Sequence, residues 1–182
     1  MNFKILLTLS ALSLGVSPAA LAGGTNNWGT TSDVLALGLP ALAAGAAWAQ
    51  NDTEGIKELT YSLGSTYAAA MVLKKSIHST RPDGSDNEGF PSGHTALAFA
   101  AARFMDKRYG AEIANFTPWM YVAAGLTGVA RVQANQHHWQ DVLAGGALGY
   151  VTANYLTEPV KGGQLSLLPT PGGIILAWRH SY

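Results

Sequence analysis

The sequence contains no cysteine and carries little charge. Its 182 residues include 11 basic and 11 acidic side chains, 12% of the chain, whereas a soluble domain usually has about 25%. The absence of cysteine excludes a disulfide scaffold, cysteine-ligated zinc and thiol catalysis. Zero net charge argues against a nucleic-acid partner, because such proteins need a basic face to neutralise phosphates. The remaining composition, 48% apolar with 21 glycines, suits a chain packed in water or in lipid alike.

The first 22 residues have the pattern of a secretory signal peptide. A mildly positive start precedes an apolar stretch from Ile5 to Val16, and Ala20 and Ala22 form a small-x-small cleavage site. The apolar stretch is shorter than the roughly 20 residues of a membrane span, which favours cleavage over an uncleaved first helix. We therefore expect a mature chain of residues 23–182, a single domain exported to a bacterial periplasm.

Apolar runs, caps and helix breakers predict an all-α bundle of five core helices. The expected helices cover about 32–50, with Ser32 or Asp33 as the cap, 54–78, 92–109, 117–131 and 138–157. Residues 79–92 are rich in Asp, Gly, Asn, Glu and Pro and are expected to form a loop. Two short apolar runs around a Pro/Gly turn, 165–168 and 174–178, predict a small C-terminal β-hairpin.

Three short blocks combine residue types that suit a phosphate site. They are Lys74 with Arg81-Pro82, then Pro91-Ser92-Gly93-His94, then Arg131 with His137 and Asp141. Each also has an ordinary structural explanation, as a basic helix end, a helix cap and a surface His–Asp pair. The second block offers a phosphate the unpaired N–H groups and positive dipole end of a helix, with His94 beside it as a proton donor. In the third, a carboxylate four residues after His137 would fix its tautomer and leave the other ring nitrogen as the nucleophile.

All three blocks fall at helix ends on the same side of an up-and-down bundle. The first block closes the second expected helix, the second opens the third, and the third lies between the fourth and fifth. Lys74, Arg81, Arg131, one helix N-terminus and two histidines would then converge. Such a set forms an oxyanion pocket with a nucleophile and an acid. His138 is interpreted as a structural or rim residue.

These blocks resemble the signature of the type 2 phosphatidic acid phosphatase superfamily, which includes bacterial class A acid phosphatases, lipid phosphatases and vanadium haloperoxidases. The resemblance covers residues 74–141 by motif. It implies the phosphate-binding residues Lys74, Arg81, Ser92, Gly93 and Arg131. It implies that His137 attacks phosphorus to form a phosphohistidine, that His94 protonates the leaving oxygen, and that Asp141 orients His137. It implies neither a metal nor another cofactor for the phosphatases.

One position departs from the family pattern. The family has a serine directly before the arginine of the third block, whereas this chain has Ala130. A hydroxyl contact to phosphate or to Arg131 would then be missing. One such hydrogen bond contributes about 1 kcal/mol, so slower turnover is expected rather than loss of function.

The expected function is hydrolysis of a phosphomonoester in the bacterial envelope. The export signal and the apolar helices favour a lipid or isoprenoid phosphate over a soluble organic phosphate. A vanadate-dependent haloperoxidase and a non-catalytic phosphate-binding bundle are the alternatives.

Two topologies also fit the pattern. Charges such as Arg103 and Asp106 favour a periplasmic domain, with or without association with a membrane surface, because charge inside a bilayer is costly. A six-span inner-membrane protein is the alternative, in which the helix count places all three blocks on the outer side.

Overall fold

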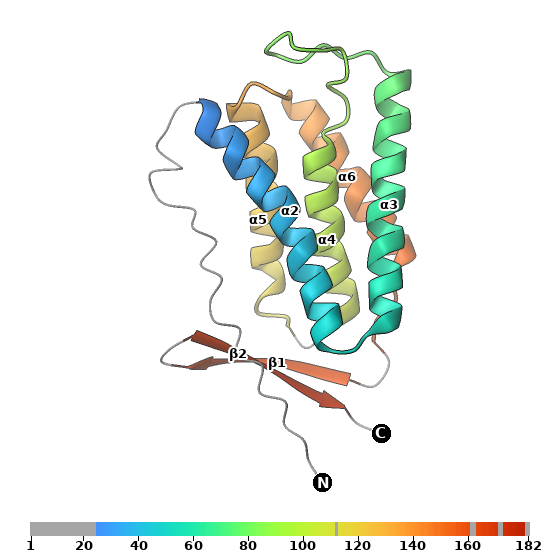
Figure 1. Cartoon of the computed structure of the whole chain (residues 1–182), viewed down its shortest axis with the longest axis vertical. Helices are drawn as coiled ribbons and strands as arrows, with labels where there is room; N and C mark the ends of the chain where they lie inside the picture. Colours follow the sequence, from blue (N-terminus) through green and yellow to red (C-terminus); the bar gives the residue numbers. More distant parts are fainter. Residues whose placement is uncertain (1–24, 112, 161–162, 171–172, 181–182) are drawn as a thin grey trace.

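The computed structural model describes residues 25–111, 113–160, 163–170 and 173–180 (Figure 1). Its helices are α2 (Thr25–Ala49), α3 (Thr53–Ser76), α4 (Gly93–Tyr109), α5 (Thr117–Gln133) and α6 (Trp139–Leu156). Strands β1 (Gly163–Thr170) and β2 (Gly173–His180) pair in antiparallel register, from Gly163 opposite His180 to Thr170 opposite Gly173. The prediction of an all-α bundle with five core helices is confirmed, and the hairpin lies where it was expected. The proposed signal peptide, residues 1–22, lies outside the described residues.

Helix α2 begins earlier than predicted. Its first residue is Thr25, so the expected cap at Ser32 or Asp33 is wrong. The hydroxyls of Thr31 and Ser32 donate hydrogen bonds to carbonyl oxygens one turn back, at 2.8 and 2.7 Å. Hydroxyls that bond back to the preceding turn are satisfied inside a helix and do not need to cap one.

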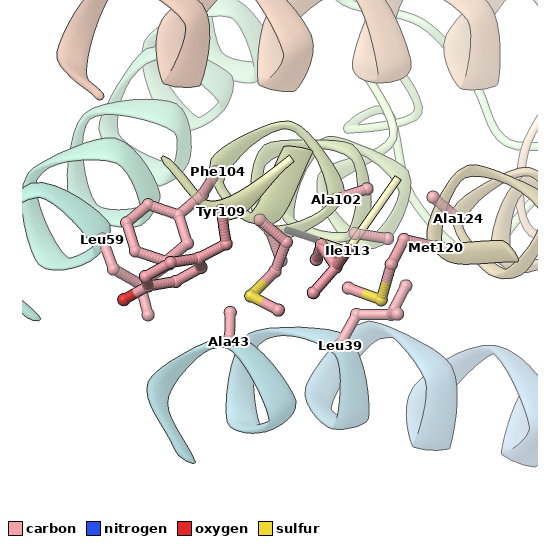
Figure 2. Packing of buried hydrophobic residues seen from close by; sticks show 12 residues of the cluster. Leu39, Ala43, Leu59, Ala102, Phe104, Tyr109, Ile113, Met120 and Ala124 are labelled. Atoms are coloured by element: carbon pink, nitrogen blue, oxygen red, sulfur yellow. The ribbon is translucent and has the colours of Figure 1, made fainter. Parts of the chain in front are cut away.

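Helix α4 is the central element, since it packs against each of the other four helices (Figure 1). Its face toward α2 and α5 is lined by small residues, several of them alanines without measurable exposure. Phe104 and Tyr109 supply the bulk of the core and meet edge to face, with ring centroids 5.8 Å apart. Leu39 and Met120 close the core from α2 and α5 (Figure 2).

Two glycines set the distance between α4 and α6. A Cβ atom on Gly145 would collide with the carbonyl oxygen of Ser92, and one on Gly149 would collide with that of Ala96. Close helix approach of this kind needs residues without side chains. The backbone of Ser92 is fixed to α6 as well, because its N–H donates to the carbonyl oxygen of Asp141 at 2.9 Å. The start of α4 is therefore held firmly against the start of α6.

A buried charge cluster fastens the end of the bundle where α2 meets α3. Arg108 donates to both carboxylate oxygens of Asp52, each at 2.5 Å, and to Glu58 at 2.8 Å. The hydroxyl of Tyr109 donates to Asp52 at 2.7 Å. A paired arginine in a fork geometry fixes orientation strongly. This cluster and the hairpin lie at one end of the bundle, and the connection 77–92 lies at the other (Figure 1).

Candidate active site

The end of the bundle that carries the connection 77–92 holds every residue of the three motif blocks (Figure 1). Lys74 lies in the last turn of α3, and Arg131 lies near the end of α5. Gly93 and His94 open α4, whereas Asp141 lies in the first turn of α6. The remaining members lie in the segments between helices and are Arg81, Pro82, Pro91, Ser92 and His137. Residues far apart in sequence are thus brought to one face because the helices alternate in direction.

The two basic residues of the first block are tied to the connecting loop. The ammonium group of Lys74 is buried and donates to the carbonyl oxygen of Glu88. Arg81 donates from Nε to Asp86 at 2.7 Å, and its Nη1 lies 3.4 Å from the carbonyl oxygen of Gln136. These contacts position the loop over the starts of α4 and α6.

The first turn of α4 is open on the side where an anion would bind. Ser92 precedes the helix, and its hydroxyl bonds to that of Thr95 at 2.9 Å instead of capping a backbone N–H. A Cβ atom added at Gly93 would meet nothing within 4 Å. Uncapped N–H groups at a helix start, next to open space, form a site that favours a phosphate.

His137 is buried, with 2% of its surface exposed, and a backbone carbonyl holds its ring. Its Nδ1 lies 2.7 Å from the carbonyl oxygen of Gly89, whereas the nearer oxygen of Asp141 is 3.6 Å away. A carbonyl oxygen can only accept, so Nδ1 carries the proton and Nε2 keeps its lone pair. Burial, followed by the charges of Arg81 and Arg131, lowers the pKa of His137 to about 3. The ring is therefore neutral near pH 7, as a nucleophile must be.

Asp141 does not make the hydrogen bond to His137 that the sequence suggests. His137 precedes the helix, whose first residue is Trp139, so its four-residue spacing from Asp141 is not a helical spacing. The carboxylate accepts instead from the backbone N–H of His138 at 2.8 Å and so caps α6. Its other oxygen, Oδ1, is buried and has no hydrogen-bond partner among the described residues.

Asp33 on α2 contacts both His94, the candidate acid, and Arg131. One of its carboxylate oxygens lies 3.0 Å from Nε2 of His94 and 3.2 Å from Nη1 of Arg131. The same nitrogen of Arg131 also lies 3.2 Å from the hydroxyl of Ser32. The Nε of Arg131 is buried and has no hydrogen-bond partner in the described part of the chain. A buried guanidinium with a free donor is suited to receive an anion oxygen.

Sequence reasoning missed Asp33 and Ser32 because it assigned them to a helix cap. The available signal was that Asp33 is the sole charged residue among the 25 residues of α2. An isolated acid in an apolar helix commonly has a partner elsewhere. The described residues contain no group of three or more His, Cys, Asp or Glu side chains that could hold a metal ion.

Comparison with known proteins decides the family. Residues 55–161, more than half of the chain, match the PAP2 superfamily. The chain belongs to the type 2 phosphatidic acid phosphatase (PAP2) superfamily. The match confirms the family predicted from the three motif blocks, and the matched region contains all three blocks. It begins after α2, so Asp33 lies outside it.

Two curated PAP2 relatives are named as lipid A phosphatases. The chain is 39% identical over 94 residues to "Lipid A 1-phosphatase" of Porphyromonas gingivalis, which is 48% of this chain and 20% of that protein. It is 30% identical over 148 residues to "Lipid A 4'-phosphatase" of Helicobacter pylori, which is 75% of this chain and 73% of that protein. The chain thus spans about a fifth of the first relative and most of the second.

A solved structure supports the fold. The crystal structure of LpxE from Aquifex aeolicus is similar with a TM-score of 0.53 and 22% identity. The similarity covers 68% of this chain and 84% of that one. At this identity the comparison shows the PAP2 helical bundle and not the activity.

Proposed function

We propose that this PAP2 protein is a phosphomonoesterase that hydrolyses lipid phosphates through a phosphohistidine intermediate. The observation that carries the proposal is the state of His137. The ring is buried and neutral, its Nδ1 is bound to a carbonyl oxygen, and basic side chains surround it. The hydrogen bond to Gly89 uses only Nδ1 and leaves the lone pair of Nε2 available. This lone pair suits attack on a phosphorus atom whose oxygens the cations hold.

The phosphoryl oxygens would be held by Lys74, Arg81, Arg131, the hydroxyl of Ser92 and the N–H of Gly93. The buried Nε of Arg131 and the uncapped start of α4 support this assignment, since Nε has no acceptor and the helix start no side-chain cap among the described residues. Together they would neutralise the negative charge that otherwise repels a nucleophile.

The chemistry would proceed in two displacements. In the first, Nε2 of His137 attacks phosphorus and the P–O bond to the leaving group breaks, while His94 gives its proton to the leaving oxygen. In the second, water gives a proton to His94 and attacks phosphorus, the P–N bond breaks, and inorganic phosphate leaves with His137 neutral again. Each step uses groups of this chain and water.

The names of the relatives and the apolar surface support a lipid substrate. Large apolar side chains are exposed on the helices, among them Leu37, Trp48 and Leu143, each more than two-thirds exposed. Among the described helices, one stretch, Asn27–Ala49, is long and apolar enough to cross a membrane. Apolar surface on this scale usually meets a partner or a lipid. We place the protein at a membrane of the cell envelope, exported as its first 22 residues suggest.

The assay for this function is phosphate release from a lipid phosphate in detergent micelles and from p-nitrophenyl phosphate. We expect wild-type protein and the His138→Asn variant to release phosphate and the His137→Ala variant to release none. Equal rates for wild type and His137→Ala would overturn the proposal. A carbonate wash of isolated membranes then separates a peripheral arrangement, which is extracted, from an integral one, which is retained.

A further inference from the structure

The outer side of the helix pair α5 and α6 carries an apolar groove that the phosphate chemistry does not use. The groove has a volume of about 500 Å³ and is lined by apolar residues. Its walls and floor include Val122, Leu126, Trp139, Leu143 and Phe99. Leu143 and Trp139 are more than half exposed, so no other described part of the chain covers them.

One end of the groove lies at the same end of the bundle as the candidate active site. Trp139 is the first residue of α6 and follows His137 by two residues. Val129, which lines the opposite wall, precedes Arg131 by two residues on α5. From Trp139 the groove extends along α6 as far as Ala147, which is a length of about 12 Å at the helical rise. It therefore leads away from the phosphate pocket along the side of the bundle.

Glycines leave the groove hollow. A Cβ atom on Gly125 would meet nothing within 4 Å, so the space beside it is open. Gly146 lies across from it, where a Cβ atom would come within 3.3 Å of the ring of Phe99. A Cβ atom at Gly125 would thus add to the groove lining without touching any described atom. This property gives a direct way to fill the groove.

We propose that this groove binds the apolar chain of the substrate while its phosphate occupies the pocket at the end of the bundle. The proposal rests on the proposed phosphatase function and names the part of the substrate that the phosphate pocket cannot recognise. Apart from the indole N–H of Trp139, the groove is lined by apolar side chains and glycines, so a polar head group would lose most of its hydration there without compensation. A hydrocarbon chain gains free energy along the same surface.

The test uses alkyl phosphates of increasing chain length, dispersed below their micelle concentration, with the variants Gly125→Leu and Gly64→Leu. Gly64 is the matched control, because its Cβ position on α3 is also open but lies on another helix. For wild type, kcat/KM should rise by up to about fourfold for each methylene that the groove buries and then level off. Gly125→Leu should lose at least tenfold on the longest ester and nothing on the shortest, whereas Gly64→Leu should match wild type.

The possible outcomes distinguish a failure of the groove proposal from a failure of the proposed phosphatase function. A wild type that hydrolyses no ester of the series overturns the proposed function itself. A Gly125→Leu protein that keeps the full dependence on chain length overturns the groove alone. A loss seen on vesicles but not on dispersed esters also overturns it, because the groove would then be a membrane contact. If Gly125→Leu does not fold, Leu143→Ser tests the same wall at an exposed position and should weaken the dependence in the same direction.

Discussion

Nδ1 of His137 lies 2.7 Å from the carbonyl oxygen of Gly89, closer than the 3.6 Å that separates it from the carboxylate of Asp141. The tautomer of the proposed nucleophile is therefore set by the backbone of the connecting loop. Gly89 itself is confined there, because a Cβ atom on it would come within 2.8 Å of the carbonyl oxygen of Ser79. The loop between α3 and α4 thus supplies both a cation, Arg81, and the acceptor that orients the nucleophile.

Substitution of Asp141 tests this assignment. Asn at this position keeps an acceptor for the N–H of His138 and removes the charge, so we expect α6 to stay capped and part of kcat to remain. Ala removes the acceptor and should lower the free energy of unfolding by about 1 kcal/mol. Steady-state kinetics and thermal unfolding measure the two effects. An Asp141→Asn protein as inactive as His137→Ala would show that the carboxylate, not Gly89, controls the imidazole.

The low pKa of His137 makes stability depend on pH. In the folded state the pKa is about 3, below the value near 6.5 of an exposed histidine, so the unfolded chain binds the proton first as pH falls. The free energy of unfolding should therefore decrease between about pH 6.5 and pH 3, with a contribution from this residue of up to about 1.4 kcal/mol per pH unit. Denaturant titrations of wild type and His137→Gln across this range measure it. The same slope in both proteins would contradict the low pKa.

Asp33 should control the pH range in which His94 acts as an acid. Burial and the nearby Arg131 and Arg81 lower the pKa of His94, and Asp33 opposes them. The Asp33→Asn substitution removes the opposing charge, so the alkaline limb of the kcat/KM profile should move to lower pH. Glu54→Gln is the control, since Glu54 pairs with Lys57 at the opposite end of α3. An unmoved limb in Asp33→Asn would rule out this role.

The Ala130→Ser substitution tests the departure from the family pattern. The residue is fully buried directly before Arg131, where the family has serine. Ala130→Ser restores one hydroxyl, and one hydrogen bond of about 1 kcal/mol corresponds to an increase of about fivefold in kcat/KM. Ala123→Ser, two turns earlier on α5, should leave the rate unchanged. A decrease in Ala130→Ser would mean that the chain has adapted its pocket to the alanine.

Helix boundaries were predicted best where a local sequence signal marks them. Ser92 before Gly93, and Pro118 in the first turn of α5, mark helix starts that the structure confirms. The position of all three motif blocks at one end of the bundle followed from the order of the helices alone. The predicted start of α2, with Ser32 or Asp33 as its cap, was wrong, because the hydroxyl of Ser32 bonds to the preceding turn of its own helix.

Other features depend on contacts between distant segments. The hydrogen bond from His137 to the carbonyl oxygen of Gly89 joins residues 48 positions apart, and the one from Arg131 to Asp33 joins residues 98 positions apart. The groove arises from where Gly125 lies relative to α6, which no local pattern encodes. The motifs therefore predicted a phosphate site. The packing of the helices was needed to show which groups position its side chains.

The most direct test of the proposed role of His137 is to trap the phosphoenzyme. Wild-type protein is mixed with a phosphate ester, quenched within one turnover and digested, and the phosphorylated residue is located by fragmentation in a mass spectrometer. We expect an acid-labile, base-stable phosphoryl group on His137, absent from His138 and from the His137→Ala protein. Turnover with the phosphoryl group on another residue, or with His137 never labelled, would contradict this role.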